Sequence, residues 1–176
     1  MMAVRDGDLD ALGPLFEKYH KALYHHFLMQ TSRPQLSEDL VQEVFFRILK
    51  YRQTYRGESK FSTWMYSIAH NVKVDYFRKK KLKMVNIENA NPIPSSIPGP
   101  DVQTEQKDEA DLIQQSLQKL PDDKREVLLL SRFQNMKYEE IGKITGCAIG
   151  TIKARVHHAL KDISVIYKDL AGERLS

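Results

Sequence analysis

The sequence predicts an all-α protein of two small helical domains joined by a flexible linker. Apolar residues recur every three or four positions along most of the chain, which is the spacing of one face of an α-helix. Alternating apolar and polar runs typical of strands are missing, and the hairpin dipeptide Asp-Gly occurs only at residues 6–7. Four of the seven prolines fall within residues 92–100, where they interrupt regular structure. We therefore expect domains at residues 1–83 and 109–176, with a linker at 84–108.

The composition of the 176 residues is typical of a folded chain. Apolar residues make up 41% and charged residues 28%, which is enough apolar material for a core and too much for a disordered chain. No apolar run approaches the roughly 18 residues of a membrane span, and the start of the chain lacks the apolar segment of a signal peptide. The single cysteine, Cys147, excludes an internal disulfide. We expect a cytoplasmic chain without membrane insertion.

The net charge of +4 is unevenly distributed. Residues 1–83 carry a formal charge of +6, residues 84–110 carry −4, and residues 111–176 carry +2. Two basic blocks on either side of an acidic spacer are typical of two modules that face nucleic acid.

The first helices of the chain follow from its apolar stripes. One stripe spans residues 9–27, and Gly13-Pro14 predicts a kink or a break within it. A second stripe predicts a helix at residues 37–50, with Ser37 as its N-cap.

The face of helix 37–50 opposite its apolar stripe is acidic and carries one aromatic residue. Because carboxylates repel DNA, we expect this face of a basic chain to bind a protein. A simple solvated face is the alternative. The residues concerned are Asp39, Gln42, Glu43 and Phe46.

A third helix, predicted at residues 61–81, ends in a basic stretch. Residues 70–83 hold six lysines and arginines against one acid, Asp75. Charge of this density binds phosphate, while amide and aromatic side chains can contact unpaired bases. Trp64 lies on the apolar stripe and is expected in the core. The residues expected to contact nucleic acid are Asn71, Lys73, Arg78 and Lys79.

The second domain is predicted to contain four helices, the last two forming a helix-turn-helix. Its first helix ends at Pro121, and Asp122 can cap the next, which is expected to bury Phe133. A turn at residues 146–148 separates a helix at 138–145 from the last helix.

The last helix is predicted to enter the major groove of DNA. Its apolar stripe runs through Ile152, Val156, Leu160 and Ile163, and long hydrogen-bond donors lie opposite. An ordinary solvated face is the alternative, but the preceding helix at turn spacing favours DNA binding. The expected DNA contacts are Thr151, Lys153, Arg155, His158 and Lys161.

No catalytic group of residues is evident in the sequence. There is no glycine-rich phosphate loop, and Cys147 has no neighbouring base that would make it a nucleophile. The two pairs of adjacent histidines splay apart on a helix and make poor metal sites. We expect neither an enzyme nor a bound metal or cofactor.

Several segments, in this order, resemble bacterial RNA polymerase sigma factors of the sigma-70 family. The short two-domain form is similar to the extracytoplasmic-function group, also called group IV, which keeps only regions 2 and 4. The matching segments are Ser-Glu-Asp-Leu-Val-Gln-Glu-Val-Phe (37–45), Phe-Ser-Thr-Trp-Met-Tyr-Ser-Ile-Ala-His-Asn (61–71), Asp-Tyr-Phe-Arg (75–78), Leu-Pro-Asp-Asp-Lys-Arg-Glu-Val-Leu-Leu-Leu (120–130), Tyr-Glu-Glu-Ile-Gly (138–142) and Gly-Thr-Ile-Lys-Ala-Arg (150–155).

The resemblance implies a role for each segment. Asp39, Gln42 and Glu43 match positions that bind the clamp helices of the β′ subunit. Residues 71–81 match the segment that binds the melted −10 element, and residues 138–161 match the one that reads the duplex −35 element. Family members also contact the β flap, and an anti-sigma factor is a common partner in the group.

Two other functions fit parts of the same pattern. A free-standing helix-turn-helix regulator would bind duplex DNA without polymerase and would have no use for the acidic face of helix 37–50. A decoy would occupy core polymerase and drive no transcription.

Overall fold

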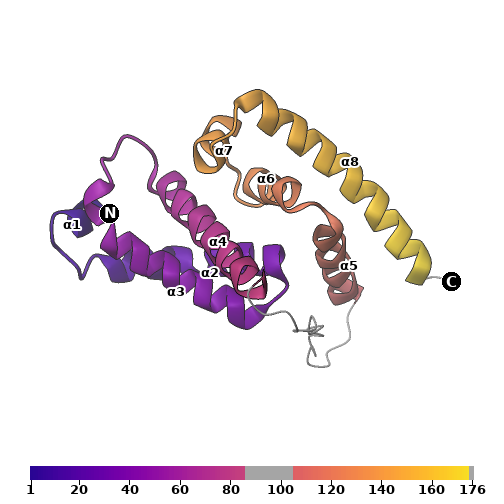
Figure 1. Cartoon of the computed structure of the whole chain (residues 1–176), viewed down its shortest axis with the longest axis horizontal. Helices are drawn as coiled ribbons and strands as arrows, with labels where there is room; N and C mark the ends of the chain where they lie inside the picture. Colours follow the sequence, from indigo (N-terminus) through magenta and orange to yellow (C-terminus); the bar gives the residue numbers. More distant parts are fainter. Residues whose placement is uncertain (86–104, 175–176) are drawn as a thin grey trace. The chain divides into compact units, whose positions relative to one another are not determined.

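The computed structural model describes residues 1–85 and 105–174, and every regular element within these ranges is helical (Figure 1). The predicted all-α fold is therefore confirmed. The elements are α1 (Met2–Arg5), α2 (Leu12–Thr31), α3 (Pro34–Lys50), the short 3-10 helix η1 (Arg52–Thr54), α4 (Phe61–Val85), α5 (Glu105–Lys119), α6 (Asp122–Arg132), α7 (Tyr138–Thr145) and α8 (Ile149–Arg174).

The described residues fall into two compact units. The first comprises residues 1–25 and 33–85, and the second comprises residues 26–32 and 105–174. Helix reaches into both ends of the segment that the sequence assigned to a linker, because α4 continues to Val85 and α5 begins at Glu105. The rest of that segment lies outside the described residues. No helix in the described ranges has both the length and the apolar content needed to cross a membrane.

The core of the first unit lies between α3 and α4. Val44 and Ile48 of α3 and Met65 of α4 are fully buried, and Leu23 of α2 is buried with them in the same unit. Burial of such side chains contributes about 1.5–3 kcal/mol each, which makes the apolar stripes the main source of stability.

Two of the expected helix starts differ from the structure. Helix α3 begins at Pro34, so Ser37 is not its N-cap; Ser37 is fully buried and its Oγ donates a hydrogen bond to the Arg33 carbonyl at 2.8 Å. Proline is favoured at the first helical position because its missing N–H has no partner there. Similarly, α2 begins at Leu12, which puts Gly13-Pro14 in its first turn instead of at a kink.

The second unit is built around α8. One apolar cluster is formed by the buried residues Leu117 of α5, Leu120 directly after that helix, Leu128 and Leu129 of α6, and Ala159 of α8.

The sequence misplaced three residues of this unit. Leu160, which it put on the buried stripe of α8, is 38% exposed, and its neighbour Ala159 is buried instead. Phe133, at the end of α6, is 47% exposed. Asp122 is the first helical residue of α6, and Pro121 takes the N-cap position without a side-chain hydrogen bond.

The turn between α7 and α8 depends on two glycines. Gly146 ends α7 with a φ of 69°, in the left-handed region that glycine adopts without strain. One turn earlier, a Cβ atom on Gly142 would lie only 2.8 Å from the carbonyl oxygen of Cys147. The Cys147 N–H donates to the Gly142 carbonyl at 3.2 Å, so the turn folds directly onto the helix. The predicted helix at 138–145 and its turn are confirmed.

Candidate protein and nucleic-acid interfaces

The acidic face of α3 lies on the surface of the first unit. Asp39 and Gln42 are exposed, and Phe46 has 60% of its surface exposed. Glu43 is half-buried, because its carboxylate receives a hydrogen bond from Arg47 Nε at 2.7 Å. The structure thus brings together all four residues that the sequence assigned to this face. An exposed phenylalanine among polar side chains can add apolar contact area to a protein interface.

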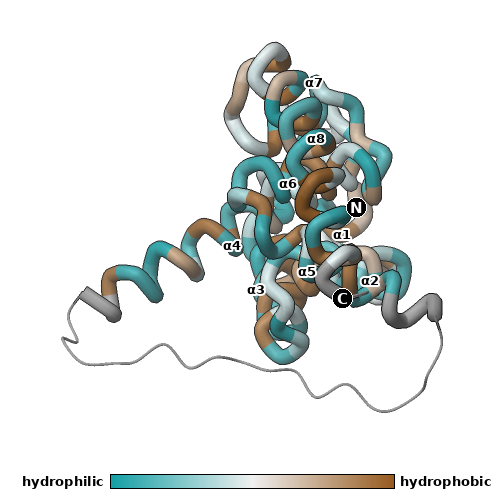
Figure 2. Tube along the Cα trace, turned by 90° about the vertical axis from the view of Figure 1, so that its right-hand side faces the viewer, coloured by the Kyte–Doolittle hydropathy of each residue, from teal (hydrophilic) through white to brown (hydrophobic). Residues whose placement is uncertain are grey.

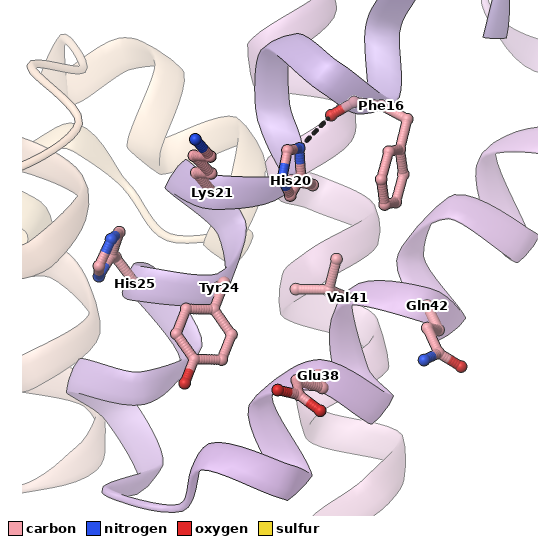
Figure 3. A pocket seen from close by; sticks show the side chains of 8 residues that line it. All are labelled: Phe16, His20, Lys21, Tyr24, His25, Glu38, Val41 and Gln42. Atoms are coloured by element: carbon pink, nitrogen blue, oxygen red, sulfur yellow. Dashed lines mark hydrogen bonds between the residues drawn. The ribbon is translucent and has the colours of Figure 1, made fainter. Parts of the chain in front are cut away.

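A pocket of about 480 Å³ between α2 and α3 adjoins this face at Gln42 (Figure 3). Its apolar walls come from Phe16 and Tyr24 of α2 and Val41 of α3, and His20 donates a hydrogen bond from Nδ1 to the Phe16 carbonyl at 2.9 Å. The sequence pattern does not indicate the pocket, because Phe16 lies within the apolar stripe at residues 9–27 and is nevertheless 38% exposed. The lining residues are Phe16, His20, Lys21, Tyr24, His25, Glu38, Val41 and Gln42.

Three of the four residues expected to bind the −10 DNA are exposed on α4. Asn71, Arg78 and Lys79 lie at its surface, where hydrophilic and hydrophobic residues alternate along the helix (Figure 2). Lys73 does not lie with them: only 2% of it is exposed. It follows the buried Ala69 by four residues, so helical periodicity directs it to the core side of α4. Lys73 is therefore not among the residues of α4 that a phosphate can reach.

A network of ion pairs joins the acidic face of α3 to the basic end of α4. Arg47 donates from Nε to Glu43 at 2.7 Å and from a terminal nitrogen to Asp75 at 2.8 Å. The other oxygen of Asp75 accepts a hydrogen bond from Arg78 at 2.9 Å. The hydrogen bond from Arg47 lowers the pKa of Asp75 below its usual range, because it stabilises the charged carboxylate.

Aromatic side chains pack at the start of α4. The ring of Trp64 lies 5.2 Å from that of Tyr55 and 6.1 Å from that of Phe61, measured between centroids. Tyr55 is buried, whereas Trp64 is half-buried, so Trp64 belongs to the edge of the core and not to its interior as expected.

Helix α8 presents most of its expected DNA contacts to solvent. Thr151, Lys153, His158 and Lys161 are exposed. Arg155 is half-buried, because its Nε lies 3.2 Å from a carboxylate oxygen of Asp123 and one terminal nitrogen lies 3.4 Å from the Cys147 sulfur. In the free chain the Arg155 guanidinium therefore lies against Asp123 and Cys147. No pattern in the sequence links Asp123 to Arg155, because the two residues lie 32 positions apart.

Two family models match this chain. The model described as Sigma-70 region 2 matches residues 15–83, and the model described as Sigma-70, region 4 matches residues 110–163.

Curated relatives match over most of the chain. The ECF RNA polymerase sigma factor SigW of Bacillus subtilis is 28% identical, with 95% of this chain and 94% of the relative covered. The ECF RNA polymerase sigma factor EcfG of Rhodopseudomonas palustris is 31% identical, with coverage of 78% and 75%.

Solved structures match as well. The sigma factor RpoE from Bartonella quintana, determined in complex with the anti-sigma factor NepR, has a TM-score of 0.71 and 25% identity. The comparison covers 89% of this chain and 96% of that chain. CnrH, determined in complex with the cytosolic domain of CnrY, shares the fold with a TM-score of 0.72 at 18% identity, covering 96% and 94% of the two chains.

Proposed function

This chain belongs to the sigma-70 family of RNA polymerase sigma factors, in the extracytoplasmic-function group, and we propose how its residues share the family's task. It directs core RNA polymerase to specific promoters and assists their opening. The family consists of initiation factors without enzymatic activity. The roles given to single residues below are proposals.

Core polymerase binds the face of α3 formed by Asp39, Gln42, Glu43 and Phe46. This assignment is supported by the combination of exposed acids with a phenylalanine that is 60% exposed, since aromatic side chains are enriched at protein interfaces. Gln42 also opens onto the pocket between α2 and α3, so an apolar side chain of the polymerase can add buried contact area beside the charged contacts.

The melted −10 element binds along the exposed side of α4. Asn71 has an amide that both donates and accepts, which suits an unpaired base edge. Arg78 and Lys79 hold the phosphates beside it. Lys73 has no part in this contact, since its side chain is buried.

The start of α8 binds in the major groove of the duplex −35 element. Thr151, Lys153 and Arg155 lie in the N-terminal half of the helix, where base edges are contacted. His158 and Lys161 lie further along and contact phosphate. Arg155 is the candidate for base reading, because a guanidinium can bind guanine through two hydrogen bonds and its partly exposed pair with Asp123 is weak enough to exchange.

Two further proposals concern the chain's surroundings. Because core polymerase and promoters lie in the cytoplasm, the chain acts there. An anti-sigma factor is its regulatory partner, by analogy with the similar sigma factor RpoE in complex with the anti-sigma factor NepR.

Run-off transcription with purified core polymerase on a genomic promoter library tests the function. The chain is expected to add promoter-specific transcripts. A DNA-binding chain that adds none is a free-standing regulator, and a chain that binds core and only lowers transcription is a decoy.

Paired substitutions test the assigned faces. Asp39→Ala with Glu43→Ala is expected to weaken core binding while thermal unfolding stays close to that of the wild type, since neither residue lies in the core. Asn71→Ala is expected to leave core binding intact and to weaken binding of −10 single strands by the holoenzyme. Equal loss of core binding in both variants would contradict the separation of the two faces.

A further inference from the structure

Four charged residues form a continuous chain of hydrogen bonds across the first unit. The order is Glu43, Arg47, Asp75 and Arg78, and successive donor–acceptor distances are 2.7, 2.8 and 2.9 Å. One end, Glu43, lies on the proposed polymerase face of α3. The other end, Arg78, lies on the proposed DNA face of α4. The two faces are therefore connected by direct contacts.

Arg47 is the junction of this network. Its planar guanidinium presents several N–H groups in a fixed fork, and two of its nitrogens bond carboxylates on different helices. A lysine has the same charge but a compact ammonium on a flexible stem, which does not reproduce this fork. Arginine at this position therefore does more than neutralise charge.

We propose that Arg47 and Asp75 are positioning residues that couple polymerase binding at Glu43 to DNA binding by Arg78. The proposal deepens the proposed function and rests on it. In the free chain, Asp75 shares its two oxygens between Arg47 and Arg78.

When a cationic group of the polymerase binds Glu43, Arg47 loses one of its two carboxylate acceptors and its hydrogen bond to Asp75 becomes stronger. Asp75 then holds Arg78 less strongly, and Arg78 becomes available to a phosphate. The exchange is easy at the DNA end, because the Arg78 side chain is 68% exposed and exposed ion pairs are weak.

Coupling of this kind is reciprocal. If polymerase binding raises the affinity of the chain for −10 DNA, then DNA raises its affinity for polymerase by the same factor. The coupling factor is therefore the ratio of two measured affinities for core polymerase, with and without saturating −10 single strand. A general change of surface charge alters DNA binding of the free and bound chain alike and cancels in this ratio.

The experiment measures this ratio for the full chain with purified core polymerase, by fluorescence anisotropy of labelled protein. Arg47→Lys and Asp75→Asn are each expected to lower the ratio about two- to fivefold, the range that exposed ion pairs support. Arg78→Gln is expected to lower it similarly, and adding Arg47→Lys to Arg78→Gln is expected to lower it no further. Thermal unfolding of each variant confirms that it is folded.

Asp39→Asn is the matched control, because Asp39 lies on the same face of α3 outside the network. It is expected to weaken core binding equally with and without DNA, which leaves the ratio unchanged.

The coupling would be overturned if the ratio stays unchanged in both Arg47→Lys and Asp75→Asn, or if Arg47→Lys and Arg78→Gln lower it independently. The proposed function would still stand in that case, because wild-type transcription is unaffected. A wild-type chain that fails to bind core polymerase would overturn the proposed function and the coupling together.

Discussion

Replacing Gly142 by alanine tests whether the turn between α7 and α8 is as tight as described. The new Cβ would lie 2.8 Å from the Cys147 carbonyl oxygen, whereas ordinary contact begins at 3.4 Å. The backbone of the turn would have to move by about 0.6 Å. Overpacking of this kind costs about 1–3 kcal/mol, and the better helix propensity of alanine returns up to about 1 kcal/mol. We expect a net loss of about 1–2 kcal/mol.

The assay is thermal unfolding followed by circular dichroism, with duplex −35 binding measured in parallel. In a small domain each kcal/mol lowers the Tm by about 4–8 °C. Gly150→Ala is the matched control, because a Cβ there meets nothing within 4 Å. It is expected to leave the Tm unchanged or slightly raised. A Gly142→Ala variant as stable as Gly150→Ala would refute the argument that glycine is required for close approach.

Three further results are expected. Trp64→Ala is expected to lower the free energy of unfolding by about 2–3 kcal/mol in chemical denaturation. This is less than the roughly 3–5 kcal/mol of a fully buried aromatic, because Trp64 is half-buried. A larger loss would contradict its position at the edge of the core. Since Arg47 lowers the folded-state pKa of Asp75, this ion pair stabilises the chain above the unfolded pKa of about 4 and is lost as pH falls through the lower folded value. Unfolding from pH 6 to pH 2 should therefore show a weaker acid dependence in Asp75→Asn, and an identical profile would contradict the shift. Ser37→Ala should cost about 1 kcal/mol, because it removes the buried hydrogen bond to the Arg33 carbonyl; an unchanged denaturation midpoint would count against that bond.

The helices themselves could be predicted, because the spacing of apolar residues is enough to identify a helix. The stripe of α3 and the segment at residues 138–145 gave helices and a turn that the structure confirms. Helix starts were less predictable, because Ser37 is as suitable an N-cap as any serine until Pro34 is seen to begin the helix three residues earlier. Ala159 is buried and Leu160 is exposed because of how closely α8 packs against the rest of its unit. The hydrophobicity of the two residues does not predict this outcome.

The candidate site was predictable where exposure follows from helical position. Asp39, Gln42 and Phe46 lie opposite an apolar stripe and are exposed as expected. Lys73 is buried despite its charge, because its four-residue spacing from the buried Ala69 places it on the core side of α4. The pocket beside Gln42 and the contact of Asp123 with Arg155 join residues far apart in sequence, and only the packing of helices brings such residues together.

The length of α8 has a mechanical consequence for promoter reading. Its 26 residues form one uninterrupted rod of about 39 Å. A tilt of only about 5° about its far end would displace the first turn by about 3 Å, as much as the length of a hydrogen bond. The angular stiffness of the rod comes from its buried side, where Ile152, Val156 and Ala159 contact the rest of the unit. Accuracy in choosing a base at the start of α8 is therefore set in part by buried apolar residues on the opposite side of the same helix, up to about two turns away.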